Sequence, residues 1–254
     1  PLTPRLHRRV PALDSASVIP MIAATALAET IDWLNDGCPS APQAEQALSE
    51  LCARLTGCGV PLVHGAIFVR TLHPEILGRR FLWHPQSGVT ASSVGYELFD
   101  DPEYQSSPIR YVFDQGKPLR RQIGDPGCPM DFSFLDKFRE EGVTDFVALP
   151  LQASDGAIHA SAWMTPAAGG FSDEDLAALH AIQKPLARMV EVRSLKRTAI
   201  NLLDTYVGGQ AGARILGGSI RRGNIELIRA AIWLSDMRGF TARADRMPAA
   251  DLVE

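Results

Sequence analysis

Apolar positions recur at helical spacing in two stretches before residue 60. In residues 43–56, alanine and leucine recur at i, i+4, i+7 and i+11, which places them on one face of a helix. Residues 21–35 have helical spacing too, and the Gly-Cys-Pro-Ser run at 37–40 separates the two helices. We expect this N-terminal pair of helices to pack on another part of the chain.

The middle of the chain changes to short runs rich in Val, Ile, Phe and Trp, which predict β-strands. Ala153-Ser154-Asp155-Gly156 predicts a hairpin between the last two runs, because glycine tolerates the positive φ of the turn. Helices are predicted at about 106–115 and 131–141. Strands in a hairpin with helices in the crossovers indicate an α+β sandwich rather than a parallel α/β fold. The predicted strands are Val60–Arg70, Arg80–His84, Leu119–Ile123, Thr144–Gln152 and Ala157–Thr165.

A long helix is predicted from Ser172, a natural N-cap that three acidic residues follow, to about Tyr206. Pro185 removes one backbone hydrogen bond and should kink this helix. A helix of about 33 residues is about 50 Å long, too long for one small domain to cover. We therefore expect either a two-chain coiled coil, with its apolar seam diluted by basic residues, or a helix that packs within the chain.

Composition narrows the classes of function. The 254 residues carry 25 Lys and Arg against 29 Asp and Glu, and a net charge of −4 argues against a general nucleic-acid binder. The longest weakly polar run, Val18–Ala28, is too short to cross a bilayer, which takes about 20 residues. No secretory signal is visible, so we expect a cytoplasmic protein with no membrane span. The surplus of basic residues after Arg188 suits an anionic ligand or a solvated helix surface.

The last thirty or so residues contain the most specific chemistry. An apolar run, Ile225–Leu234, predicts a strand that ends in Asp236, followed by a turn at Gly239 and a helix over 242–254. A carboxylate at a strand end is a hard oxygen ligand suited to Mg²⁺. Backbone N–H groups at a glycine turn and helix start suit a phosphate. The pattern therefore predicts a metal–triphosphate corner, with an ordinary turn as the alternative.

Residues 231–241, which read Ala-Ile-Trp-Leu-Ser-Asp-Met-Arg-Gly-Phe-Thr, resemble the opening of the class III adenylate/guanylate cyclase catalytic domain. Residues 202–207 and 215–223 resemble the short transducer segment that precedes that domain. The resemblance implies a nucleotidyl cyclase (a lyase) that uses Mg²⁺ or Mn²⁺. It implies that Asp236 and the Met237 backbone carbonyl lie at the metal, and that the backbone of Gly239, Phe240 and Thr241 faces the triphosphate.

The second metal aspartate, the base-recognising residues and the Asn/Arg pair of that family would lie beyond Glu254. We therefore expect no complete catalytic site in this chain and no activity from it alone. The full-length protein is expected to convert ATP to cyclic AMP and pyrophosphate, with GTP and cyclic GMP as the alternative substrate and product.

Residues 57–170 resemble a GAF-type sensor domain in element order, in the closing Asp-Gly hairpin, in the Gly-Gly-Phe-Ser step at 169–172 and in the long exit helix. A PAS-type domain is the nearest competitor. The resemblance implies a GAF-like antiparallel sheet flanked by helices, an unidentified small-molecule effector and a homodimer. Arg120 and Arg121 could bind an anionic effector or lie on an exposed strand face; no effector-binding residue is assigned.

The expected domain organisation is a helical region over 1–56, the sensor over 57–170, a linker and dimerisation helix over 171–206, and a last part over 207–254. That last part holds the transducer and the first strand-turn-helix of a ferredoxin-like cyclase domain. Two functions stay open. The chain is either the regulatory portion of a cyclase or a stand-alone GAF-like binding module with a degenerate cyclase remnant.

Overall fold

The computed structural model describes residues 15–73, 75–218, 231 and 233–248. The chain forms two compact units, one up to Ala213 and one from Arg214 onward. None of the helices in the described ranges is both long and apolar enough to cross a membrane.

The first unit is built on one six-stranded sheet in which every pair of neighbouring strands is antiparallel. Its strand order is β3-β2-β1-β6-β5-β4, so the first and last strands of the chain's sheet meet in its centre. This confirms the expected α+β class with an antiparallel sheet. The strands are β1 (His64–Arg70), β2 (Ile76–His84), β3 (Gly88–Gly95), β4 (Leu119–Arg121), β5 (Asp145–Gln152) and β6 (Ile158–Thr165).

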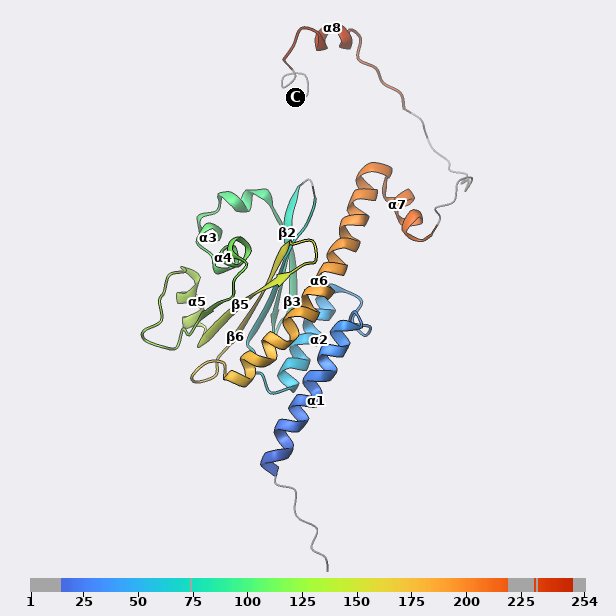
Figure 1. Ribbon diagram of the computed structural model, residues 1–254. Coiled ribbons are helices and arrows are strands. Elements are labelled where there is room, and N and C mark those ends of the chain that lie inside the picture. The colour runs from blue at the N-terminus through green and yellow to red at the C-terminus, as the bar shows by residue number, and fades with distance from the viewer. Residues whose placement is uncertain (1–14, 74, 219–230, 232, 249–254) are drawn as a thin grey trace, which may run out of the picture. The chain divides into compact units, whose positions relative to one another are not determined.

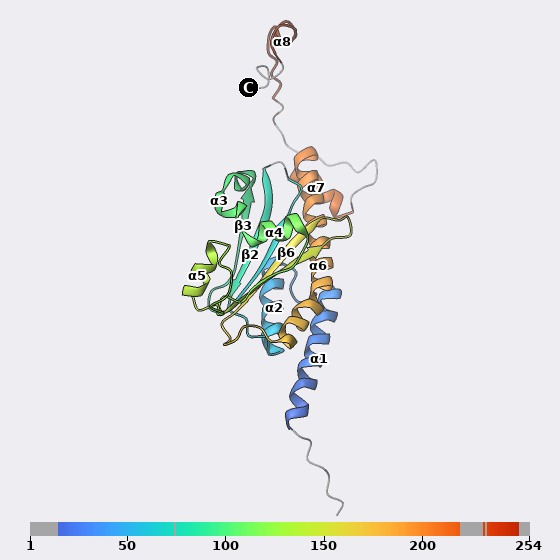
Figure 2. The same ribbon diagram turned by 60° about the vertical axis from the view of Figure 1, so that its left-hand side comes forward.

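Helices cover both faces of the sheet (Figures 1 and 2). One face packs on α1 (Ser15–Asn35), α2 (Ala44–Gly57) and the first half of α6 (Asp173–Val207). The other face packs on α4 (Pro108–Gln115) and α5 (Phe134–Glu140). The remaining short elements are η1 (Tyr96–Asp100), α3 (Pro102–Gln105), α7 (Gly209–Leu216) and α8 (Phe240–Ala244).

The strongest local signals in the sequence form the predicted structures. Gly156 has φ +88° in the turn between β5 and β6, whose register begins with Gln152 opposite Ile158. Ser172 caps α6 by accepting a hydrogen bond of 3.1 Å from the Asp175 N–H. The Asp175 carboxylate accepts one of 2.9 Å from the Ser172 N–H in return, which completes a capping box.

The long helix α6 divides into two halves. Its first half, up to Glu191, is buried against the sheet and α1, as the intramolecular alternative predicts. Its second half exposes apolar side chains; Val192 is 64 % and Tyr206 80 % exposed. The prediction that a second chain covers this half is not tested by the structure of a single chain.

The prediction of a strand over residues 225–234 is wrong for those of its residues that the structure describes. Ala231, Trp233 and Leu234 lie in no strand, and Trp233 and Leu234 are about nine-tenths exposed; residues 225–230 and 232 lie outside the described part. Where the structure describes the helix expected over 242–254, it finds the shorter α8, which residues 245–248 do not continue. Residues 249–254 lie outside the described part. An apolar run forms a stable strand only when it pairs with others and buries a face, and the described residues of this unit contain no strand to pair with.

A buried ion pair joins the sheet edge to the start of α6. Asp145 on β5 is fully buried, and Arg120 on β4 donates to its carboxylate at 3.0 and 2.7 Å. The Phe171 N–H donates to the same carboxylate at 3.1 Å, and Arg120 donates to the Phe171 carbonyl at 3.0 Å. The other basic residue of β4, Arg121, pairs with Asp131.

Replacing Arg120 by Met is expected to lower the free energy of unfolding by about 3 kcal/mol, because a buried carboxylate loses its counter-ion. The apolar stem of methionine keeps the packing of the arginine stem. Arg121→Met, which breaks a more exposed pair on the same strand, should cost less than about 1 kcal/mol. Urea unfolding of both variants measures the difference, and equal losses would contradict the role given to the buried pair.

Candidate functional site

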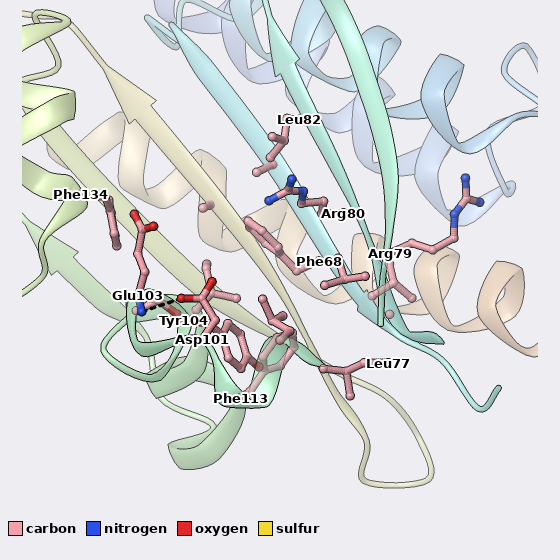
Figure 3. A pocket seen from close by; sticks show the side chains of 18 of the residues that line it. Phe68, Leu77, Arg79, Arg80, Leu82, Asp101, Glu103, Tyr104, Phe113 and Phe134 are labelled. Atoms are coloured by element: carbon pink, nitrogen blue, oxygen red, sulfur yellow. Dashed lines mark hydrogen bonds between the residues drawn. The ribbon is translucent and has the colours of Figure 1, made fainter. Parts of the chain in front are cut away.

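A cavity of about 350 Å³ lies between the second face of the sheet and the segment from η1 to α5 (Figure 3). Residues of β1, β2 and β6 form its floor, and residues of η1, α3, α4 and α5 form its walls. Natural ligand pockets have volumes of about 300–1,000 Å³, so this cavity has the size of a small-molecule site. Its floor includes Ala66, Phe68, Leu82, Ala162 and Met164.

The cavity exists because the floor residues in the centre of the sheet are small. Ala66 on β1 lies directly opposite Ala162 on β6, and Ala162 lies opposite Ala148 on β5. All three belong to the cluster that packs on α4 and α5. Close packing normally leaves few voids. Ala66 and Ala162 line the cavity, and their small methyl groups leave space that larger side chains would fill.

Charged side chains border this apolar floor. Arg80 on β2 lines the cavity, and its Nε donates a hydrogen bond of 2.8 Å to the Ser92 hydroxyl. Asp101 and Glu103 line the wall at α3, where the Asp101 carboxylate accepts the Glu103 N–H at 2.9 Å. Arg79 is different: Figure 3 shows its side chain pointing away from the floor.

A second arginine group adjoins the wall at α4. The Arg70 guanidinium stacks over the Phe113 ring at 4.3 Å, and it lies 3.9 Å from the Asp114 carboxylate, which also pairs with Arg110. The Nε of Arg70 and one terminal nitrogen of Arg110 are buried without a hydrogen-bond partner. Two guanidinium groups that share one carboxylate make this wall electropositive.

Two histidines lie on the floor's strands, beside Phe138 and Glu141 of the α5 region. The ring centres of His64 and His84 are 5.0 Å apart, and the Glu141 carboxylate is 3.5 Å from the His64 Nε2. Burial and the neighbouring His84 lower the pKa of His64. No group of three or more His, Cys, Asp or Glu side chains in the described ranges could hold a metal ion.

The hairpin between β5 and β6 is attached to α6. The Ser154 N–H donates to the Glu191 carboxylate at 2.9 Å, and the Ser154 hydroxyl and Arg188 bond the same carboxylate. These hydrogen bonds, with Ser154 the main cause, lower the pKa of Glu191. About two turns before Glu191 on α6, the Gln183 amide donates to the Pro150 carbonyl at 2.6 Å.

The cavity and this attachment share one strand pair. Arg70, whose side chain lines the cavity, donates its backbone N–H to Nδ1 of His159 at 3.2 Å. His159 is 4 % exposed, and burial lowers its pKa. Asp155 and Glu191 act on His159 electrostatically. The end of β1 at the cavity is thus joined to the hairpin that α6 holds.

The residues that the cyclase resemblance selects lie in the other unit and are exposed, among them Asp236 and Thr241. The Met237 carbonyl accepts the Phe240 N–H at 3.2 Å, and Gly239 has φ +75° at the N-terminus of α8. Asp236 is the only carboxylate among them, and one carboxylate does not make a two-metal site. The part of this unit that the structure describes therefore does not fit Mg²⁺ or Mn²⁺ by itself, and the metal and triphosphate roles stay predictions.

Sequence reasoning missed the cavity. The one sequence signal for its floor is the alternation of side chains along β6. Ala160, Ala162 and Met164 face one side of the sheet, and Ser161 and Trp163 face the other. That alternation marks a two-sided strand, but the void arises when alanines of different strands meet in register. Its wall comes from η1 and α3, which have no strong sequence signal.

Comparison with solved structures finds GAF domains at low identity. The GAF domain of a phosphoenolpyruvate-protein phosphotransferase from Coxiella burnetii is 16 % identical, with 70 % of this chain and 96 % of that chain covered and a TM-score of 0.47. The nlh2 GAF domain of A. aeolicus in an inactive state is 16 % identical, with 67 % and 99 % covered and a TM-score of 0.44. A phycocyanobilin-bound GAF domain of a cyanobacterial phytochrome is 14 % identical, with 67 % and 96 % covered and the same TM-score.

No family model matches the chain, and no curated protein matches it. The first unit has an α+β architecture: a six-stranded antiparallel sheet with helices on both faces. Identities and TM-scores this low assign neither a ligand nor a partner to this chain. No cyclase stands among the similar structures described above.

Replacing Glu191 by Gln is expected to loosen the hairpin from α6, because the charged acceptor for Ser154 and Arg188 is lost. The Ser154 amide should exchange its hydrogen faster in this variant. In the unmodified protein the lowered pKa of Glu191 means that the carboxylate stabilises the fold above the ordinary glutamate pKa of about 4.3. This contribution is lost as the pH falls through the lowered value.

Hydrogen exchange followed by NMR at pH 7 and at pH 3 measures the protection of Ser154. Glu174→Gln, which removes an exposed carboxylate in the first turn of the same helix, is the matched control and should leave that protection unchanged. Equal protection in both variants and at both pH values would contradict the attachment.

Proposed function

We propose that the first unit is a GAF-like small-molecule sensor and that its ligand binds in the cavity between the sheet and α3–α5. The observation that carries this proposal is the cavity itself, about 350 Å³ with an apolar floor and charged borders. An apolar floor supplies binding energy, and a few polar groups orient the ligand.

In this proposal α6 transmits a shift of the sheet, caused by ligand binding, to the rest of the protein. The helix is bonded to β5 and to the β5–β6 hairpin through Gln183, Arg188 and Glu191, and its start is held by the Arg120–Asp145 pair. A ligand that shifts the cavity floor relative to these anchors also shifts α6. The exposed apolar residues on the second half of α6 favour a second copy of the chain as its partner.

The second candidate is the regulatory portion of a class III nucleotidyl cyclase, with ATP as the substrate of the full-length enzyme. The residues at 231–241 favour it, and so does the glycine turn that starts a helix at Phe240. Asp236 would bind one of two metal ions there. Reading the coding sequence beyond residue 254 tests it: a second Asp followed by Asn and Arg in cyclase spacing supports this candidate, and a stop codon contradicts it.

The 254-residue chain is expected to make no cyclic nucleotide from ATP or GTP in the presence of Mg²⁺ or Mn²⁺. A single carboxylate cannot position both the metal that activates the 3′-hydroxyl and the metal that holds the triphosphate. Chromatography of the reaction mixture measures cyclic AMP and cyclic GMP directly. Robust formation of either product would contradict this reasoning.

Replacing Ala162 by Phe is expected to weaken binding of 8-anilinonaphthalene-1-sulfonate about tenfold or more, because the added ring occupies the cavity floor. Fluorescence titration of the folded protein measures the dissociation constant. Ala181→Phe, at an exposed position on α6, is the matched control and should bind the probe as the unmodified protein does.

Ala66→Leu fills the same floor with a smaller side chain and serves if the phenylalanine variant unfolds. Circular dichroism melting confirms the fold of each variant. No binding by the unmodified protein, or equal binding by the cavity and control variants, would contradict the placement of the ligand site.

A further inference from the structure

Opposite charges line the cavity without meeting each other. Arg80 lies on the floor side of β2, directly opposite Phe68 in the register, and its one hydrogen bond runs to the neutral hydroxyl of Ser92. Asp101 and Glu103 lie on the wall at α3 (Figure 3). Within the residues that the structure describes, none of these three charged side chains forms an ion pair.

The other cationic groups near the cavity are engaged elsewhere. Arg70 lies over Phe113 and beside Asp114. Arg79 lies over the Phe81 ring and 3.5 Å from the Glu45 carboxylate, on the opposite face of the sheet. Arg80 is therefore the guanidinium of the floor that can meet an anion without losing a carboxylate partner.

Aromatic rings form much of the lining of the cavity. Aromatic pairs stack or meet edge to face at centroid distances of about 4.5–7 Å and gain energy beyond their buried area. A dry engineered cavity of about 150 Å³ holds benzene, so about 350 Å³ holds a one- or two-ring system with a polar arm. The lining rings are Phe68, Tyr104, Phe113, Phe134, Phe138 and Phe146.

Resting on the proposed sensor function, we infer that the cavity selects an aromatic zwitterion. The ring system fills the apolar centre, a carboxylate of the ligand meets the Arg80 guanidinium, and an ammonium group meets the carboxylates of Asp101 and Glu103. Charge-assisted hydrogen bonds of this kind are stronger than neutral ones. A free amino acid with an aromatic side chain is the simplest molecule of this class.

Four probes with one ring system separate the contributions of the charges. Tryptophan carries both charges, indole-3-acetate only the anion, tryptamine only the cation, and indole neither. Isothermal titration calorimetry of the unmodified protein should give the tightest binding for tryptophan and the weakest for indole. Each charge should tighten binding about tenfold, as a hydrogen bond to a charged group would.

Variants that each remove a charge from the cavity show which residue accounts for each gain in affinity. Arg80→Gln should weaken tryptophan and indole-3-acetate about tenfold and leave tryptamine and indole unchanged. Glu103→Gln combined with Asp101→Asn, which keeps an N-cap side chain, should weaken tryptophan and tryptamine only. Two control variants remove a neighbouring charge of the same sign: Arg79→Gln, whose side chain points away from the floor, and Asp100→Asn. Neither should change the binding of any of the four probes.

The outcomes separate this inference from the proposed function. If indole binds as tightly as tryptophan, or if the control variants weaken binding as much as the cavity variants, the ligand class is wrong and the cavity site stands. If 8-anilinonaphthalene-1-sulfonate binds and none of the four probes does, the ligand class is wrong as well. If neither that probe nor any of the four binds, the sensor proposal and the ligand class both fail.

Discussion

The first unit depends on a sheet whose two faces carry side chains of different size. Strand β6 illustrates this, because Trp163 points to one face and its neighbour Ala162 to the other. The face with large side chains is filled by α1, α2 and α6, while the face with alanines leaves a cavity under α3, α4 and α5. A shift of one residue in the register would exchange the faces, so packing and cavity come from the same alternation.

The two ends of strand β5 connect the sheet to α6. Strand β5 begins at Asp145, which holds the segment before α6 through Arg120 and Phe171. At its far end, the Gln152 carbonyl accepts a hydrogen bond from Arg188 of α6. The first half of α6 is thus fixed at both ends of one strand. In the proposed sensor, a change in the cavity floor on β1 and β6 acts on this strand through its hydrogen-bonded neighbours, and α6 is the output of the unit.

Local signals in the sequence predicted much of the fold. The Asp-Gly turn, the Ser172 cap and the apolar stripe of α2 each depend on residues a few positions apart, and all three formed as expected. The edge strand β3 was missed because its sequence, Gly-Val-Thr-Ala-Ser-Ser-Val-Gly, is small and polar.

The candidate site could not be predicted in the same way. The cavity depends on which alanines face each other across strands, and this is decided by long-range register. The apolar run at Trp233 and Leu234 shows the opposite error, since strand-forming residues alone do not form a strand without partners.

The central claim is that a ligand binds between the sheet and α3–α5. Methyl NMR of the protein with labelled alanines tests it most directly, because buried alanines lie at both faces of the sheet. Titration with 8-anilinonaphthalene-1-sulfonate is predicted to shift the methyl signals of Ala66 and Ala162, on the cavity face. The signals of Ala47 and Ala178, which pack on the other face, should stay in place. Shifts confined to Ala47 and Ala178, with Ala66 and Ala162 unmoved, would contradict a ligand site between the sheet and α3–α5.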